Sequence, residues 1–232
     1  MNISKNLREL VLDTETTGLY HATGDRIVDI ACVELINHIP TGKTYQVYIN
    51  PEREMHKDAT AISGITDDFL VGKPLFREIV DEFLDFVQDS KLVIHNAKFD
   101  IGFLNSELSR LDKPLFSMKN TVDTLDMARK KFPGSPANLD ALCKRFEVDT
   151  SARTKHGALI DCFLLAEVYI NLLGGRQSDL TFHPEKTTAG DLKVTRSTKN
   201  VRPKRRFDVS EDEKNTHDEF LKTVNSPLWK KR

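Results

Sequence analysis

The stretch that decides the fold is "RELVLDTETTGLY", residues 8–20. Its apolar first half is typical of a buried β-strand, which ends abruptly at two carboxylates, Asp13 and Glu15. Residues i and i+2 of a strand point to the same face of a sheet, so these side chains should lie side by side. Neighbouring carboxylates raise the pKa of one of them or require a cation between them. The stretch therefore predicts a strand that ends in a cation-binding site.

Length and composition predict a soluble globular chain with one good-sized domain and an appendage. The 232 residues are 39% hydrophobic and 30% charged. No run approaches the roughly 18 apolar residues of a membrane span, and the first ten residues lack the apolar core of a secretion signal. The three cysteines are scattered and form no CxxC pair, which favours reduced thiols. We therefore expect a cytoplasmic protein with no membrane partner.

The net charge of −1 is unevenly distributed along the chain. Residues 1–182 carry 21 Lys and Arg against 27 Asp and Glu, whereas residues 183–210 carry 8 basic and 3 acidic residues. The body is acidic, so bulk charge alone does not indicate a nucleic-acid binder. Any such activity must come from a local site.

Hydrophobic periodicity predicts an α/β fold, a mixed sheet flanked by helices. Three strands come first, in residues 9–14, 25–36 and 43–51, and their short connections favour an antiparallel meander. Helical and strand patterns then alternate. The remaining predicted elements are helices in 75–90, 99–112, 138–146 and 157–173, a strand in 91–96, and a strand that runs into a helix in 120–132.

Two further motifs place acidic residues among apolar ones, where burying a charged carboxylate costs free energy. Asp100 ends "HNAKFD", residues 95–100, just after a buried strand. Asp161 lies in "HGALIDC", residues 156–162, within an apolar helix where an unpaired carboxylate costs several kcal/mol. Five residues turn an ideal helix by about 500°, so His156 and Asp161 cannot share a helical face. We therefore expect His156 on the loop before the helix.

Four carboxylates that converge on one cleft form an oxygen-rich site, which suits Mg²⁺ or Mn²⁺. Two such ions about 3.5–4 Å apart can hold the attacking and leaving oxygens of a phosphoryl displacement. A histidine beside them can supply a base that works near neutral pH. The pattern therefore predicts hydrolysis of a phosphodiester with two divalent cations as cofactors.

Several other polar residues have ordinary structural interpretations. A single D-x-E at a strand end is common, and only the combination of motifs gives it weight. We expect a structural histidine at His95, a helix start at Asn96 and helix capping at Asp123 and Asp126. His56, His183 and His217 are expected to be solvated.

The triple "DTETTG … HNAKFD … HGALID" closely resembles the exonuclease superfamily whose sites hold Asp, Glu, Asp, Asp and a histidine. The resemblance covers roughly residues 7–175. It implies a ribonuclease H-like fold and 3′→5′ removal of nucleoside 5′-monophosphates. It also implies His156 as general base and, as metal ligands directly or through water, Asp13, Glu15, Asp100 and Asp161, of which Asp13, Glu15 and Asp161 also bind the substrate.

The segment "DATAISGIT", residues 58–66, resembles less cleanly a family stretch that contacts the terminal nucleotide. Asp58 fits the acidic position of that stretch. Ser63 stands where many members have a histidine. The resemblance implies both as substrate-binding candidates.

The C-terminal part narrows the family further. "QSDLTF" resembles the peptide with which bacterial replication proteins grip the sliding clamp, through Gln177, Leu180 and Phe182; in the alternative, Leu180 and Phe182 pack back on the body. Residues 211–232 are similar to the polymerase-binding tail of the proofreading subunits of bacterial DNA polymerase III. Its apolar residues are Phe220, Leu221, Val224, Leu228 and Trp229.

We therefore predict four segments: an exonuclease domain in 1–176, a clamp-binding peptide in 177–182, a flexible basic linker in 183–210 and a short polymerase-binding tail in 211–232. Such a protein would proofread frayed or single-stranded 3′ DNA ends beside a polymerase catalytic subunit and a sliding clamp, and whether a small third core subunit also binds stays open. Two alternatives remain, a free-standing exonuclease that trims RNA or DNA and an inactive nucleic-acid-binding module of the same fold.

Overall fold

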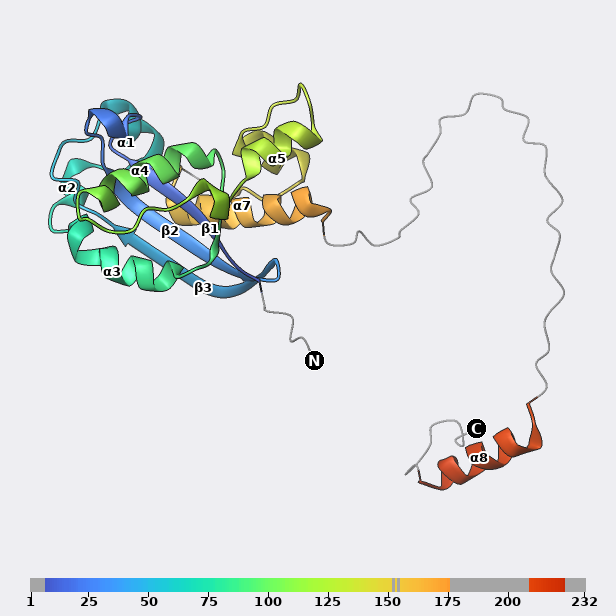
Figure 1. Ribbon diagram of the computed structural model, residues 1–232. Helices are drawn as coiled ribbons and strands as arrows, with labels where there is room; N and C mark the ends of the chain where they lie inside the picture. Colours follow the sequence, from blue (N-terminus) through green and yellow to red (C-terminus); the bar gives the residue numbers. More distant parts are fainter. Residues whose placement is uncertain (1–6, 152, 154, 176–208, 224–232) are drawn as a thin grey trace, which may run out of the picture. The chain divides into compact units, whose positions relative to one another are not determined.

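A five-stranded mixed sheet forms the centre of the domain (Figure 1). The computed structural model describes residues 7–151, 153, 155–175 and 209–223. The strand order is β3-β2-β1-β4-β5, in which β1, β2 and β3 pair antiparallel and β4 and β5 add parallel to β1. The strands are β1 Arg8–Thr16, β2 Ile27–Ile36, β3 Ile39–Tyr48, β4 Lys91–Ile94 and β5 Thr121–Asp123.

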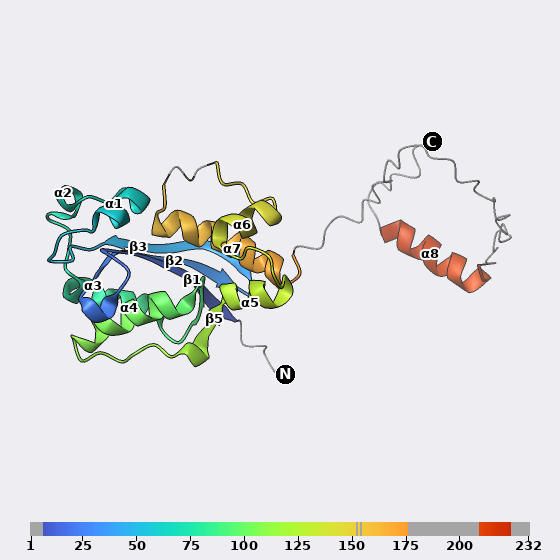
Figure 2. The same ribbon diagram turned by 90° about the horizontal axis from the view of Figure 1, so that it is seen from above.

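Helices cover both faces of this sheet, as Figure 2 shows from above. The first face carries α3 and α4, and the second carries α7, against which α5 and α6 pack. The helices of the domain are α1 Lys57–Ser63, α2 Asp67–Leu70, α3 Phe76–Val87, α4 Ala97–Ser109, α5 Thr124–Lys131, α6 Leu139–Arg145 and α7 Ala158–Leu173, and the short 3-10 turns are η1 His21–Thr23 and η2 Met118–Asn120.

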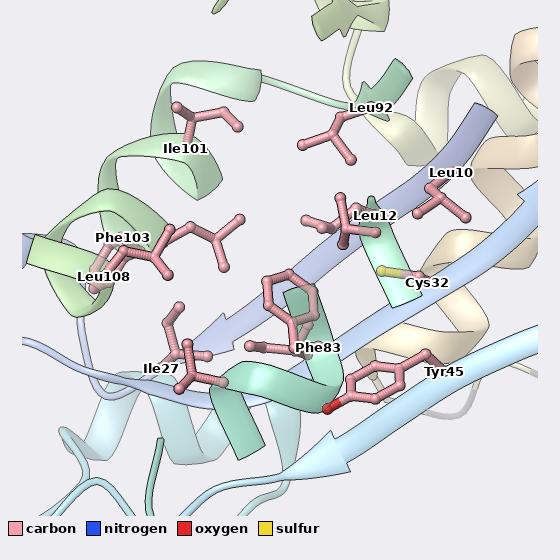
Figure 3. Packing of buried hydrophobic residues seen from close by; sticks show 14 of the residues in the cluster. Leu10, Leu12, Ile27, Cys32, Tyr45, Phe83, Leu92, Ile101, Phe103 and Leu108 are labelled. Carbon is pink, nitrogen blue, oxygen red and sulfur yellow. The ribbon is translucent and has the colours of Figure 1, made fainter. Parts of the chain in front are cut away.

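The larger core lies between the sheet and the helices α3 and α4 (Figure 3). Leu10 and Leu12 of β1 contribute to it together with Phe83 of α3 and Phe103 of α4, all of them fully buried. Val11 points to the opposite face and packs under α7. The two-residue period of β1 therefore carries Asp13 and Glu15 onto the face of α7, where the strand leaves the core.

The pairing of β1 with β2 is interrupted between Glu15 and Thr16 by a register shift. Bulges of this kind re-aim side chains next to functional sites. The pairing resumes at Thr16 opposite Ile27, and the backbone N–H of Thr17 donates to the carbonyl of Arg26 at 2.8 Å. The shift therefore lies directly between the second carboxylate and the "TTG" segment.

Most of the predicted elements are confirmed, including the antiparallel meander and the helix that ends before Gly174. Two helices, α1 and α2, were not predicted, because helices of seven and four residues show too few turns for a period to be recognised. No secondary structure was predicted for the tail either. Residues 211–223 of that tail form α8, Glu211–Thr223, in a compact unit separate from the domain.

Helix α8 begins at a capping box. The Ser210 hydroxyl accepts a hydrogen bond from the backbone N–H of Glu213, and the Glu213 carboxylate accepts one from the backbone N–H of Ser210. This reciprocal pattern satisfies two otherwise unpaired donors at the start of the helix.

Within the described residues, no helix is both long and apolar enough to cross a membrane.

Candidate active site

Three of the predicted carboxylates meet where β1 emerges from beneath α7. Ligand atoms of Asp13, Glu15 and Asp161 all lie within 4.8 Å of one another. Asp13 and Glu15 arrive from one face of β1, and Asp161 comes from the first turn of α7. Asp161, which lies 146 positions after Glu15 in the chain, thus joins the two neighbouring carboxylates of β1 in one acidic cluster.

The cluster is electrostatically unfavourable without a cation. Burial, followed by the charges of Asp100 and Glu15, raises the pKa of Asp13 well above its ordinary value. Burial and the charge of Asp161 raise the pKa of Glu15 to about 8. Carboxylates forced together in this way hold protons at neutral pH unless a positive charge compensates them.

Asp100 lies beside this cluster rather than within its 4.8 Å group. Its Oδ1 accepts hydrogen bonds from the backbone N–H of Thr14 at 3.1 Å and from the Thr14 hydroxyl at 2.8 Å. Burial raises the pKa of Asp100 to about 7, although the hydrogen bonds from Thr14 oppose the shift. Thr14 therefore ties the first turn of α4 to β1 between Asp13 and Glu15.

The donor set fits a hard divalent cation, which prefers carboxylate oxygens. The Oδ1 atom of Asp161 is buried and, among the described residues, has no hydrogen-bond partner. An unpartnered carboxylate oxygen in such a place is costly unless a ligand takes it up. The fourth carboxylate, that of Asp100, reinforces the negative potential at Asp13.

His156 lies on the loop before α7, as predicted, and its side chain is 44% exposed. Its Nδ1 is 3.2 Å from Oδ2 of Asp161, so the imidazole borders the acidic cluster. The backbone N–H of His156 donates a weak hydrogen bond to the carbonyl of Ile62 at 3.4 Å. The His156 loop therefore contacts α1.

Arg153 is a site residue that the sequence analysis missed. One guanidinium nitrogen lies 2.7 Å from Oδ2 of Asp161 and 2.6 Å from Nδ1 of His156, and another pairs with Asp140. The guanidinium compensates part of the negative charge at Asp161. Its segment has no periodicity, so only the fold reveals the contact.

A hollow of about 530 Å³ lies beside His156. Lys144, Lys155 and Arg153 line it together with Asp140. Cationic side chains thus gather next to the acidic cluster although the domain as a whole is acidic. The contrast gives the site a local positive flank.

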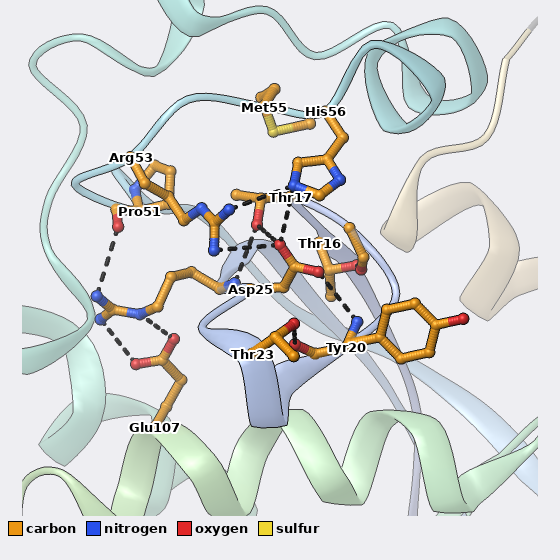
Figure 4. A network of polar contacts seen from close by, with 12 residues as sticks. Thr16, Thr17, Tyr20, Thr23, Asp25, Pro51, Arg53, Met55, His56 and Glu107 are labelled. Carbon is orange, nitrogen blue, oxygen red and sulfur yellow. Dashed lines mark hydrogen bonds and ion pairs between the residues drawn. The ribbon is translucent and has the colours of Figure 1, made fainter.

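A second polar network holds the loop that follows β1 (Figure 4). Buried Asp25 accepts hydrogen bonds from the Thr17 hydroxyl at 3.1 Å and the backbone N–H of Tyr20 at 3.0 Å. It also pairs with Arg53 at 3.2 Å and lies 3.4 Å from His56. The network links the "TTG" loop to the start of α1. Nothing in the sequence pattern distinguished Asp25.

Gly18 is required at the centre of this loop. A Cβ atom at that position would lie 2.4 Å from Oδ2 of Asp25, closer than real Cβ contacts. Only glycine therefore lets the carboxylate of Asp25 approach the backbone so closely.

The two substrate-binding candidates on α1, Asp58 and Ser63, differ in exposure and in hydrogen bonding. Asp58 is exposed in the first turn of the helix. The Ser63 hydroxyl donates to the carbonyl of Ala59 at 2.9 Å and accepts from the backbone N–H of Ile65 at 3.2 Å. Ser63 thus uses its hydroxyl to close the end of α1, and a substrate contact for either residue stays a prediction.

Two of the residues with predicted structural roles, His95 and Asp123, have those roles in the structure. His95 is hydrogen-bonded through Nδ1 to the Thr124 hydroxyl at 2.9 Å. The Asp123 carboxylate caps α5 through the backbone N–H groups of Leu125 and Asp126, and it also accepts from those of Asn96 and Ala97. Asp123 therefore anchors the starts of α5 and α4 at once. The predicted capping role of Asp126 is wrong, because its backbone N–H donates to the Asp123 carboxylate that caps the helix.

Several predictions fall outside the described residues, namely Gln177, Leu180, Phe182, Val224, Leu228 and Trp229. Phe220 and Leu221 lie on α8, where the Phe220 side chain is 61% exposed and Leu221 is half-buried. The predicted clamp and polymerase contacts stay predictions.

Comparison with known proteins decides the family. The family model "Exonuclease" (RNase_T) matches residues 10–169. The chain is 49% identical over 229 residues to DNA polymerase III subunit epsilon of Rickettsia conorii, with 94% of this chain and 97% of the relative covered. The chain belongs to the DNA polymerase III epsilon-subunit family.

A second relative and a solved structure agree with that assignment. The epsilon subunit of Escherichia coli is 41% identical over 238 residues, with 96% of this chain and 97% of the relative covered. The nuclease domain of 3′hExo, a DEDDh family member bound to rAMP, has the same fold. Its TM-score is 0.61 at 18% identity, with 73% of this chain and 93% of that chain covered.

Epsilon subunits are the proofreading exonucleases of DNA polymerase III. The predicted α/β, ribonuclease H-like fold and the predicted nuclease activity are confirmed, and with them the use of divalent metal ions as a family property.

Proposed function

We propose that this epsilon-family chain removes mispaired 3′-terminal nucleotides from DNA as 5′-monophosphates, with Asp13, Glu15, Asp100 and Asp161 holding two Mg²⁺ or Mn²⁺ ions. The observation that carries the proposal is the acidic cluster of Asp13, Glu15 and Asp161, whose ligand atoms lie within 4.8 Å of one another. When bound, the ions would stabilise the charge that develops on the scissile phosphate.

The side chains of the site have different proposed roles in metal binding, proton transfer and substrate binding. Asp161 offers the unpartnered Oδ1 as a ligand, while its Oδ2 faces Arg153 and His156. His156, half exposed at the edge of the cluster, would take a proton from the attacking water. Lys144 and Lys155 beside it suit the phosphodiester backbone of the entering strand.

The proposed substrate is a frayed or single-stranded 3′ DNA end. Asp58 on α1 is the candidate contact to the terminal nucleotide, with Ser63 as the weaker one because its hydroxyl already bonds within the helix. Asp25 would act indirectly, since its network holds the "TTG" loop against the segment that leads into α1.

The decisive experiment compares wild-type protein with Asp13→Ala on a 3′-mismatched DNA primer and on a short RNA oligomer, with Mg²⁺ and with Mn²⁺. We expect wild-type protein to prefer the mismatched DNA and Asp13→Ala to be inactive on both substrates yet folded. An active Asp13→Ala protein would overturn the site. A preference for RNA would instead favour a free-standing trimming enzyme.

We further propose two partner contacts, to the sliding clamp through Gln177, Leu180 and Phe182 and to the polymerase catalytic subunit through residues 211–232. Changing the three clamp residues to alanine should weaken clamp binding in a pull-down and leave hydrolysis of free single strands unchanged. A lowered melting temperature with intact clamp binding would instead mean that these residues pack on the domain.

A further inference from the structure

Asp29 is a fully buried carboxylate in the middle of β2, outside the four proposed metal ligands. It is the direct cross-strand partner of Glu15 on β1. Directly opposed residues of an antiparallel pair share a face of the sheet, so Asp29 lies on the same face as Glu15, under α7. An acidic residue at a fully buried strand position requires hydrogen-bond partners.

Two different elements supply those partners. The amide nitrogen of Gln46 on β3 lies 3.3 and 3.1 Å from the two carboxylate oxygens of Asp29. The backbone N–H of Ala158, the first residue of α7, is a further hydrogen-bond donor to the same carboxylate. Asp29 therefore joins β3 to the beginning of α7.

The start of α7 is the part of that helix that matters for the site. His156 lies two residues before Ala158, and Asp161 lies three residues after it. One turn further along, the thiol of Cys162 donates to the carbonyl of Ala31 on β2 at 3.3 Å. Both contacts run from α7 to β2, and only the contact at Ala158 depends on a carboxylate.

We propose that Asp29 is a positioning residue of the exonuclease site: through Gln46 and the backbone N–H of Ala158 it sets the start of α7, and thereby the places of His156 and Asp161 relative to Asp13 and Glu15. Asp29 does this without touching substrate or metal. The inference rests on the proposed function of those residues. Asp29 would thus be a fifth carboxylate of the site, one that positions other residues through its hydrogen bonds and does not bind metal.

The test compares Asp29→Leu with Asp29→Asn in the full-length chain. Leucine has a similar size but accepts no hydrogen bond, whereas asparagine can still accept from Ala158 and pair with a rotated Gln46 amide. For Asp29→Leu we expect kcat on a mismatched primer, and the affinity for Mn²⁺ measured without DNA by electron paramagnetic resonance, to fall about 10- to 100-fold. Asp29→Asn should keep most of both.

Glu34 provides the matched control. It is also buried on β2 and also fully hydrogen-bonded, to Arg8 at 2.6 Å and Thr41 at 2.7 Å, but it pairs with Leu10 rather than with the end of β1. Glu34→Leu should lower the melting temperature and leave kcat and Mn²⁺ affinity unchanged. A merely structural Asp29 would make Asp29→Leu behave in the same way.

The remaining outcomes are equally decisive. Unchanged kcat and Mn²⁺ affinity in Asp29→Leu, or an equal loss in Asp29→Asn, would overturn the proposal. If Asp29→Leu does not fold, Gln46→Leu removes one of the two hydrogen-bond partners of Asp29, and an unchanged kcat in that variant would also overturn the proposal. An active Asp13→Ala protein in the same assays would instead reject the proposed function, whatever Asp29 does.

Discussion

Asp161 shows how a single side chain can serve two neighbours. One of its oxygens is buried and unpartnered among the described residues, and the other faces Arg153 and His156. The first suits a cation and the second orients the groups that surround the reacting water. At the residue scale, the site is therefore divided between the two oxygens of one carboxylate.

His156→Ala should lower kcat by about 10²- to 10⁴-fold, because a positioned general base contributes that much. Binding of Mn²⁺ should survive, since the carboxylates remain. Histidines ordinarily titrate near neutral pH, so the acidic limb of the pH–rate profile should also disappear. Rates measured between pH 5.5 and 9 with saturating metal test this, and an unchanged profile would assign the base to another group.

At the scale of elements, α7 holds Asp161 in place over the end of β1. Its first turn carries Asp161, and its second half is fixed by the Tyr169 hydroxyl, which donates to Oε1 of buried Glu9 at 2.7 Å. The other oxygen of Glu9 lies 2.6 Å from Nδ1 of His38. The helix is thus fastened to β1 far from the chemistry, while Asp29 acts at its start.

Tyr169→Phe should lower the free energy of unfolding by about 1–3 kcal/mol, because a buried carboxylate oxygen loses its donor. The kcat at 25 °C should not change. Tyr45→Phe is the matched control, since the buried Tyr45 hydroxyl has no hydrogen-bond partner among the described residues and its loss should cost little. Urea unfolding followed by circular dichroism distinguishes the two, and equal effects would contradict the assigned role of Glu9.

For the whole molecule, the acidic site couples stability to pH and metal. Burial is the first cause of the raised pKa of Glu15, about 8, and of Asp29 and Asp100, about 7 each. In the unfolded chain these groups release their protons near pH 4 to 4.5. Between that range and pH 8 the folded state therefore binds more protons than the unfolded state, which makes stability fall as pH rises.

In EDTA, the melting temperature of the protein should accordingly fall by several degrees between pH 5 and pH 8. Mg²⁺ added at pH 8 should restore it, because a ligand that binds only the folded state stabilises that state. Asp13→Asn should flatten the pH dependence in EDTA by removing one charge from the cluster. Differential scanning fluorimetry at constant ionic strength is the measurement, and a rise toward pH 8 in EDTA would contradict the electrostatic account.

We expect catalysis and polymerase binding to reside in different segments of the chain. A protein truncated after Arg206 should fold and remain an active nuclease, because the proposed catalytic residues all lie in residues 13–161. It should no longer co-elute with the polymerase catalytic subunit in gel filtration. Trp229→Ala in the full chain should weaken the complex, since buried aromatics often dominate such interfaces. A complex retained by the truncated protein would place the contact on the catalytic domain.

The sequence by itself determined the strands and the longer helices of the domain and the chemistry of its acidic site. The two-residue period of β1 placed Asp13 and Glu15 on one face, and the cost of a charge inside an apolar helix singled out Asp161. Both arguments are local, because they depend only on neighbours along the chain. They were sufficient to predict the meander, the helix after His156 and the acidic site.

Only the tertiary structure decided which residues support that site. Arg153, Asp25 and Asp29 carry no pattern of their own in the sequence, and each acquires its role from partners on other elements. The structure also places Asp100 outside the close group of three carboxylates, where its carboxylate accepts a hydrogen bond from the Thr14 hydroxyl. The physical reason is that hydrogen bonds and Coulomb interactions depend on distances between side chains, which the packing of α4 and α7 on the sheet sets and which local periodicity does not contain.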